Sequence, residues 1–443
     1  MAETYDLIVK HGACITPGGG IGADIGVQNG RITAIGNLAN ESSRQELDVS
    51  GLVVLPGVID TQVHFREPGG EHKEDISTGS AAAALGGVTA VFEMPNTNPP
   101  TTTAEALADK CRRAKNRAWC DMAFYVGACE DNIEKLPELE RLPGCAGVKI
   151  FMGSSTGSLL IKDDKTLAQA LASGSRRCAV HCEDEESLEI RKKFIDESIG
   201  VHSHPIWRDE TTAALAVARL LKLARGVNRR VHVLHVSSAQ EMTLLRNHHD
   251  IATVEVTPQH LSLSAPECYD LLGTLAQMNP PIRGIEHKDV LWASVKGGLV
   301  DCIGSDHAPH TLEEKAKPYP QSPSGMPGVQ TLVPLMLSHV ALGNLSLERF
   351  VDLTSAGPAR IFGIAGKGRI ALGYDADFTI IDPKAKNRIS NMWIASRCGW
   401  SPFDGLKVTG WPIVTVVRGN VVMRDGELLG EPQGAAIRFL ECL

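Results

Sequence analysis

Side chains that can bind a metal ion recur along the chain at the ends of short apolar runs. His64 follows the first such run, and later runs contain or end in Lys149, His181, His235 and Asp306. Imidazole and carboxylate groups suit Zn²⁺ or a similar divalent ion, and positions left open for water are typical of a catalytic site. A single histidine after a strand is usually structural, but the repetition at equivalent positions predicts a metal centre.

Lys149 lies inside an apolar run, where a charged side chain needs a partner. One interpretation is an ion pair with a nearby carboxylate. In the other, a neutral amine beside two divalent ions reacts with carbon dioxide, and the resulting carbamate bridges both ions. The residues alone leave both interpretations open.

The apolar runs alternate with helical patterns, such as those of residues 102–117 and 209–226. Strands that are apolar throughout and alternate with helices indicate a parallel sheet buried on both faces. This alternation predicts a closed (β/α)8 barrel, or TIM barrel, in which catalytic groups gather at the carboxyl ends of the strands. The expected strands lie within residues 52–65, 87–94, 121–127, 147–151, 177–182, 231–236, 252–257 and 300–306.

The two ends of the chain have a different pattern. Residues 4–54, 368–383 and 411–430 contain short alternating segments with NG and GG turns, which are typical of antiparallel hairpins. We expect residues 1–54 and 367–443 to form one small composite β-sandwich domain, and residues 55–366 to form the catalytic barrel.

The composition excludes several classes of function. Lys and Arg total 44 against 52 Asp and Glu, a formal net charge of −8, and no basic run indicates a nucleic-acid surface. No stretch approaches the roughly 18 apolar residues of a membrane span. The 11 cysteines include no CxxC pair, which favours reduced thiols in the cytoplasm over a disulfide framework. We expect a small-molecule substrate and a homo-oligomer, either a dimer or a tetramer.

Other potential ligands are expected to be structural or solvated. Cys178 and Cys182 share one strand-like segment and are expected to fill the core. His260 is expected in a loop or behind the metal ligands. The histidines expected to be solvated lie in polar segments: His202, His204, His248 and His249.

Nine segments of the chain carry a family resemblance. They are PGVIDTQVHFREPG (56–69), MPNT (94–97), VHCED (180–184), HVSS (235–238), EVTPQHL (255–261), MNPP (278–281), SDHAPH (305–310), GYDADFTIID (373–382) and SPFDGLKVTGWPIVTVVRGNVV (401–422). Together they resemble the dihydroorotases, cyclic amidohydrolases of the amidohydrolase superfamily, over essentially the whole chain. HFREPG and SDHAPH are fairly specific within the cyclic amidohydrolases, whereas the last two segments are shared with allantoinases and dihydropyrimidinases.

The resemblance implies a centre with one or two Zn²⁺ ions per chain. His64 and Asp306 would hold one ion, His181 and His235 would hold the other, and a carboxylated Lys149 would bridge them. Asp306 would also carry the proton from the attacking hydroxide to the leaving amide nitrogen. A metal ion acidifies water and polarises the carbonyl under attack, which agrees with these implied roles.

The resemblance also implies the residues that bind the substrate. Arg66, Asn96 and His310 would bind its carboxylate, and Asn279 with the backbone near residues 325–329 would bind its ring. The planar guanidinium of Arg66 fits a carboxylate through two parallel hydrogen bonds. Its position just beyond a strand-end ligand favours this role over a surface ion pair.

Gln62 departs from the family pattern, which has histidine at both ligand positions of this strand end. An amide oxygen is a neutral and weaker ligand than an imidazole, so the first metal would be loosely held or absent. Alternatively, Gln62 hydrogen-bonds a neighbouring ligand or the bridging water without touching the metal.

The implied activity is the reversible cyclisation of N-carbamoyl-L-aspartate to L-dihydroorotate in pyrimidine biosynthesis. An allantoinase or dihydropyrimidinase activity is the first alternative, although Arg66 and His310 count against dihydropyrimidinase substrates, which lack the carboxylate. The second alternative is a catalytically silent homologue that acts as a binding partner, for instance of aspartate transcarbamoylase. Gln62 favours that alternative, and the retained ligands oppose it.

Overall fold

The computed structural model describes residues 4–154 and 159–442. Its centre is a barrel of eight parallel strands, and each strand hydrogen-bonds to the next one along the chain. An isolated bridge between Val63 and His307 connects the first strand to the segment after the last. This architecture confirms the predicted TIM barrel. The barrel strands are β8 (Val58–Val63), β9 (Val88–Glu93), β10 (Asp121–Gly127), β11 (Cys145–Phe151), β12 (Cys178–His181), β13 (Val231–Val233), β14 (Ala252–Val256) and β15 (Cys302–Ile303).

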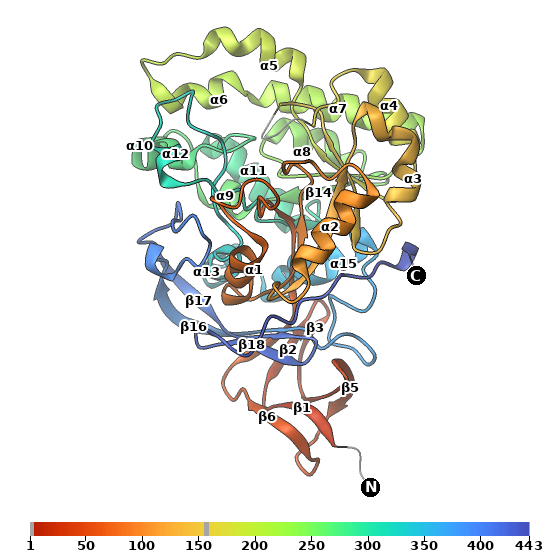
Figure 1. Ribbon diagram of the computed structural model, residues 1–443. Helices are drawn as coiled ribbons and strands as arrows, with labels where there is room; N and C mark the ends of the chain where they lie inside the picture. The colour runs from red at the N-terminus through yellow and green to blue at the C-terminus, as the bar shows by residue number, and fades with distance from the viewer. Residues whose placement is uncertain (1–3, 155–158, 443) are drawn as a thin grey trace.

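Helices surround the barrel (Figure 1). They are α1 (Ile76–Leu85), α2 (Ala104–Ala114), α3 (Leu136–Leu139), α4 (Asp164–Ala172), α5 (Glu185–Arg191), α6 (His204–Trp207), α7 (Glu210–Gly226), α8 (Ala239–Arg246), α9 (Pro258–Ser262), α10 (Glu267–Leu272), α11 (Ile285–Lys296), α12 (Leu312–Lys315), α13 (Leu332–Ala341), α14 (Leu347–Val351) and α15 (Gly357–Phe362). Polar caps set where several of them begin. Asp209 accepts the Thr212 amide at 2.9 Å at the start of α7, and Ser238 and Glu241 form a reciprocal capping box on α8.

The expected strand of residues 52–65 is in fact two strands that belong to different sheets. β7 (Val53–Pro56) pairs with the C-terminal strand β16 (Phe378–Arg388), whereas β8 joins the barrel. The chain changes sheet at Gly57, where a Cβ atom would lie 2.2 Å from Thr89 Oγ1. Only glycine allows so close an approach. The division therefore depends on a tertiary contact that the apolar pattern does not reveal.

The remaining strands form two sheets outside the barrel. They are β1 (Tyr5–Lys10), β2 (Ala13–Thr16), β3 (Gly19–Gly22), β4 (Asp24–Gln28), β5 (Arg31–Gly36), β6 (Ser43–Asp48), β17 (Lys407–Val417), β18 (Asn420–Arg424) and β19 (Glu427–Leu428). One sheet has the order β5-β4-β1-β6, and the other, β19-β18-β17-β16-β7-β2-β3, combines both ends of the chain. Leu7 and Val27 of the first sheet share a core with Phe378 and Val416 of the second. Figure 1 shows both sheets beneath the barrel.

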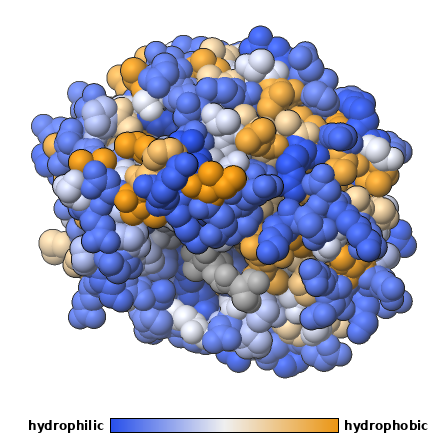
Figure 2. Space-filling view, turned by 90° about the horizontal axis from the view of Figure 1, so that it is seen from above, coloured by the Kyte–Doolittle hydropathy of each residue, from blue (hydrophilic) through white to orange (hydrophobic). Residues whose placement is uncertain are grey.

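The division into a terminal β-domain (residues 1–54 and 367–443) and a barrel domain (residues 55–366) stays a prediction. The surface seen from above the barrel is mostly hydrophilic, with separate apolar groups between the polar residues (Figure 2). No helix within the described residues is long and apolar enough to cross a membrane.

A buried lysine links the barrel to the terminal sheets. Lys367 Nζ lies 2.7 Å from a carboxylate oxygen of Asp121 on β10, 3.3 Å from Asp375 and 2.5 Å from Asp377. Burial alone would lower the pKa of Lys367, but the surrounding carboxylates, Asp377 foremost, outweigh it and raise the pKa above its ordinary value. The lysine therefore stays charged and holds the carboxylates together.

We expect Lys367→Met to lower the free energy of unfolding by about 3–5 kcal/mol, because buried carboxylates are left without their cation. Urea denaturation followed by circular dichroism measures the loss. Lys407→Met is the control, since Lys407 is exposed at the start of β17 and its substitution should change stability by less than about 0.5 kcal/mol. Equal losses in the two variants would show that Lys367 is not a structural link.

Candidate active site

One cavity at the mouth of the barrel receives side chains from the ends of successive strands. All of the expected metal ligands and substrate-binding residues line it except His310. The barrel brings together residues that lie far apart in the sequence, such as Gln62 and Asp306, which are 244 positions apart. The lining residues are Gln62, His64, Arg66, Asn96, Lys149, Phe151, His181, His235, Asn279, Asp306, Ala308, Ser324 and Gly325.

His64, Asp306 and Gln62 form one group in this cavity. His64 Nε2 lies 3.3 Å from Asp306 Oδ1, and His64 Nδ1 lies 2.9 Å from Asn96 Oδ1. The Gln62 amide donates to the same Asp306 oxygen at 2.9 Å. Gln62 Oε1 is buried and has no hydrogen-bond partner within the described residues. Gln62 thus contacts the carboxylate directly and keeps an oxygen for a cation or another donor.

His181 and His235 form a second group. His181 Nδ1 lies 3.0 Å from His235 Nε2, and the two rings meet edge to face. His181 Nε2 lies 2.9 Å from Glu183 Oε2, and Arg208 in turn pairs with that carboxylate. A carboxylate on the far nitrogen fixes the orientation and tautomer of a metal-binding histidine. His235 Nδ1 is buried without a partner in the part of the chain that the structure describes.

Burial favours the neutral forms of the ionisable groups in the cavity. It lowers the pKa values of His64 and His235 well below the usual range for histidine. Burial also lowers the pKa of Lys149 to about 7 and raises the pKa of Asp306 to about 8. A neutral imidazole has a lone pair for a divalent ion, and a neutral amine can react with carbon dioxide.

Three residues of the cavity have a left-handed backbone. The φ angles are 62° for Arg66, 38° for His235 and 45° for Asp306. Residues other than glycine rarely adopt this conformation, and such residues concentrate at functional sites. The strained positions coincide with strand ends that carry ionisable side chains, which supports a functional role for this cavity.

Arg66 is buried and lines the cavity without a carboxylate partner among the described residues. Its side chain donates to Pro309 O at 3.2 Å and lies 3.3 Å from His310 Nε2. Carboxylates such as Glu93 and Asp306 attract this guanidinium only at longer range, so an anion in direct contact would complete its site. The nitrogens of His310 also contact Lys73 Nζ at 3.2 Å and Ser324 O at 3.1 Å. A direct contact between His310 and a substrate therefore stays a prediction.

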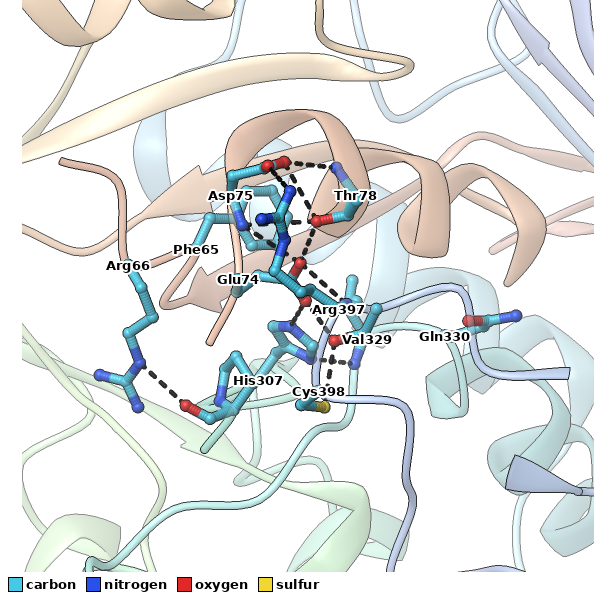
Figure 3. Close-up of polar contacts among 12 residues, drawn as sticks. Phe65, Arg66, Glu74, Asp75, Thr78, His307, Val329, Gln330, Arg397 and Cys398 are labelled. Carbon is cyan, nitrogen blue, oxygen red and sulfur yellow. Dashed lines mark hydrogen bonds and ion pairs between the residues drawn. The ribbon is translucent and has the colours of Figure 1, made fainter. Parts of the chain in front are cut away.

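Glu74, which the sequence analysis did not single out, supports the rim of the cavity. Figure 3 shows its carboxylate between His307 and Arg397. Glu74 Oε2 lies 3.2 Å from His307 Nε2, and Glu74 Oε1 accepts the Arg397 amide at 3.2 Å. Ser396 and Thr78 donate to the same carboxylate. Glu74 therefore ties the segment after β15 to the C-terminal part of the chain, and no strand-end position in the sequence indicated it.

His204 corrects an expectation from the sequence. Its polar surroundings predict a solvated side chain, but His204 is completely buried at the start of α6. Its Nε2 atom lies 3.1 Å from Asn279 Oδ1 and 3.0 Å from Met278 O, so it orients an amide that lines the cavity. The expectation was wrong because distant segments pack around this short helix. His260 is also buried, and its Nε2 atom lies 3.1 Å from Pro280 O, outside the cavity lining.

The side chains of the cavity fit a divalent ion. Imidazoles, a carboxylate, an amide oxygen and a lysine amine line one enclosed space. Two of their buried polar atoms, Gln62 Oε1 and His235 Nδ1, lack partners among the described residues. Such orphaned atoms are rare in proteins unless a ligand, ion or water satisfies them. The arrangement can therefore hold a metal ion beside a buried guanidinium.

Comparison with known proteins assigns the chain to a family. A model described as "Amidohydrolase family" matches residues 53–422. A curated dihydroorotase of Methanosarcina mazei is 37% identical to this chain, and the alignment covers 95% of this chain and 94% of the relative. A curated allantoinase of Escherichia coli is 33% identical, and the alignment covers 95% of both chains. The solved L-hydantoinase (dihydropyrimidinase) of Arthrobacter aurescens has a TM-score of 0.93 at 31% identity, with 98% of this chain and 100% of that chain covered. The chain therefore belongs to the amidohydrolase family.

Proposed function

We propose that this amidohydrolase is a dihydroorotase, which interconverts N-carbamoyl-L-aspartate and L-dihydroorotate. Curated relatives from four archaea that are 35–37% identical carry that name. The observation that carries the proposal is Arg66, a buried guanidinium on the cavity with no carboxylate partner among the described residues. The carboxylate of the substrate would supply the missing counter-charge through two parallel hydrogen bonds.

The metal in this proposal is Zn²⁺. His64 and Asp306 would hold one ion and His181 and His235 a second, with Lys149 between them as a carbamate. When bound, the metal polarises the scissile carbonyl and acidifies the attacking water. Carboxylation of Lys149 is supported by its burial, which lowers the pKa of the amine to about 7 and so provides the unprotonated form that reacts with carbon dioxide.

Asp306 is the proton carrier in this proposal. Burial raises the pKa of Asp306 to about 8, a range in which a carboxylate can both accept and release a proton near neutral pH. In ring opening, Asp306 takes a proton from the attacking water and gives it to the ring nitrogen as the C–N bond breaks. Arg66 and Asn96 would hold the carboxylate of the substrate, and Asn279, oriented by His204, would bind the ring.

Two alternatives make different predictions. A hydantoinase or allantoinase would use the same centre on uncharged rings or ureides, and curated relatives with these names are 32–34% identical. A silent homologue, bound to a partner such as aspartate transcarbamoylase, would show no turnover at all.

The proposal also includes formation of a homo-oligomer and location in the cytoplasm. The 11 cysteines, all of which are free, agree with a reducing compartment.

The protein should hydrolyse dihydroorotate and leave dihydrouracil, which lacks the carboxylate, almost untouched. A site built on buried donors rejects an analogue without the partner group by on the order of 10⁴-fold in favourable cases. The measurement is kcat/KM for both compounds with the same preparation of enzyme. Equal turnover would rule out recognition of a carboxylate by Arg66, and a preference for hydantoin or allantoin would favour the first alternative.

Asp306→Asn should leave a folded protein whose turnover is on the order of 10²–10⁴-fold lower, because an amide cannot accept the proton. Steady-state rates, with circular dichroism to confirm folding, measure the effect. Asp270→Asn is the control, since Asp270 is exposed on α10 and far from the cavity lining. A variant that keeps more than about a tenth of the rate would assign proton transfer to another group.

The Gln62→His substitution tests whether the amide oxygen of Gln62 is a weak metal ligand. If the Gln62 oxygen is a metal ligand, the ion beside His64 binds more weakly than the ion held by His181 and His235, and wild-type protein contains less than the full metal complement. The substitution should then raise the metal content, because imidazole is the better donor to Zn²⁺. Elemental analysis after dialysis measures the number of metal ions bound per chain. Two tightly bound ions in the wild type would contradict the weak site, and an unchanged count in the variant would leave Gln62 only as a hydrogen-bond donor to Asp306.

A further inference from the structure

A second set of metal-binding side chains lies inside the barrel, apart from the candidate active site. His232 of β13, Glu255 of β14 and Cys302 of β15 come from three neighbouring strands and are completely buried. None of them lines the catalytic cavity. The reaction proposed above uses none of these side chains, so their proximity calls for a separate explanation.

The three potential ligand atoms form a compact triangle. His232 Nε2 and Cys302 Sγ each lie 3.3 Å from Glu255 Oε2, and 3.8 Å separates Cys302 Sγ from His232 Nε2. A point equidistant from these atoms is about 2.0 Å from each, which equals ordinary zinc–nitrogen and zinc–oxygen distances. A small displacement from the plane provides the longer zinc–sulfur distance of about 2.3 Å. The triangle therefore has the size that a zinc ion requires.

The hydrogen bonds around His232 leave its Nε2 atom facing the carboxylate. His232 Nδ1 lies 2.8 Å from Thr253 Oγ1, and the Thr253 hydroxyl donates to Val231 O at 3.4 Å. With the Nδ1–H donated to Thr253, the Nε2 atom faces Glu255 Oε2 at 3.3 Å, either as a second N–H or as a lone pair that a metal ion could use. Two lone pairs at this distance repel each other unless a proton or a metal ion lies between them.

No lysine or arginine is in ion-pair contact with Glu255 within the residues that the structure describes, and Lys149 attracts it only at longer range. Thr61 donates to Glu255 Oε2 at 2.5 Å, and Glu255 Oε1 is buried without a hydrogen-bond partner. The contrast is the cluster of carboxylates around Lys367, where the lysine ammonium already provides the positive charge. In the triangle, His232 is the basic side chain in direct contact with Glu255 among the described residues, and a divalent ion would supply the larger positive charge that the lysine supplies in the other cluster.

We propose that His232, Glu255 and Cys302 bind a structural divalent ion, Zn²⁺ by preference, independently of any catalytic metal. Thiolate, imidazole and carboxylate form a suitable donor set for this ion. The hydroxyl of Thr61, 3.4 Å from Cys302 Sγ, lies beside the open position. On binding, the Cys302 thiol releases its proton to solvent and a metal–sulfur bond forms.

The position of the site gives the ion a structural purpose. β15 has only two residues, and it lies at the end of the hydrogen-bonded order of the barrel, next to the seam with β8. An ion held by β13, β14 and β15, with Thr61 of β8 beside it, would secure this short strand. Because all three ligands are completely buried, the ion must enter while the chain folds.

Substitution with cobalt tests the proposal by light absorption instead of activity. The full-length protein is produced in zinc-depleted medium with Co²⁺, so that the ion is present during folding. A thiolate ligand gives Co²⁺ an intense charge-transfer absorption in the near ultraviolet, which histidine, lysine and aspartate ligands do not. Wild-type protein should show this absorption. Its absence from protein that contains cobalt would overturn the proposal, whatever the outcome of the dihydroorotate assays.

Two cysteine variants then locate the thiolate. Cys302→Ser should abolish the absorption, remove one ion per chain and lower the temperature of unfolding. Cys182→Ser is the control, because Cys182 is the buried thiol next to His181, and it should keep the absorption. Absorption that survives in Cys302→Ser and disappears in Cys182→Ser would refute the site.

A third measurement applies if Cys302→Ser does not fold. X-ray absorption at the zinc edge of the Cys182→Ser protein reports the atoms around the metal directly. A sulfur neighbour supports the site at Cys302, and a shell of nitrogen and oxygen alone overturns it.

Discussion

The amide of His64 donates a hydrogen bond of 2.7 Å to the carbonyl of His307, across the seam between the first and last strands of the barrel. Since β15 has only two residues, this bond and the adjacent bridge between Val63 and His307 bring the end of β8 to the end of β15. His64 and Asp306 therefore meet because the seam closes at this point. The other lining residues follow from the same closure, since parallel strands direct all of their carboxyl ends to one face.

Burial at that face decides the charge states of the site. It lowers the pKa values of His64 and His235 well below the usual range and that of Lys149 to about 7, which favours their neutral forms. The same burial makes a guanidinium without an ion-pair partner costly, and in the proposed function the carboxylate of the substrate would offset that cost. The cavity therefore has lone pairs on its histidines and a positive charge on Arg66. This combination is suited to bind a metal ion and a carboxylate at the same time.

Buried polar residues outside the cavity hold this arrangement in place. Glu183 fixes the ring of His181, Glu74 holds the rim through His307, and His204 orients Asn279. All three are buried, and Glu74 and His204 connect segments that are distant in the sequence, whereas Glu183 lies two residues from His181. Inside the barrel, Glu255 contacts His232 at 3.3 Å, and its other carboxylate oxygen is buried without a hydrogen-bond partner among the described residues.

The sequence by itself determined the repeat of strands and helices and the strand ends that carry metal-binding side chains. Both are local patterns, namely the alternation of apolar and helical segments and the polar residues at the ends of the apolar runs. The barrel and the proximity of His64, His181 and His235 could therefore be predicted. The tertiary structure decided that the run of residues 52–65 divides at Gly57, that His204 is buried, and that the amide of Gln62 touches Asp306. These outcomes depend on partners hundreds of positions away or in other layers of the fold, and a polar residue carries no local sign of the partner it will meet.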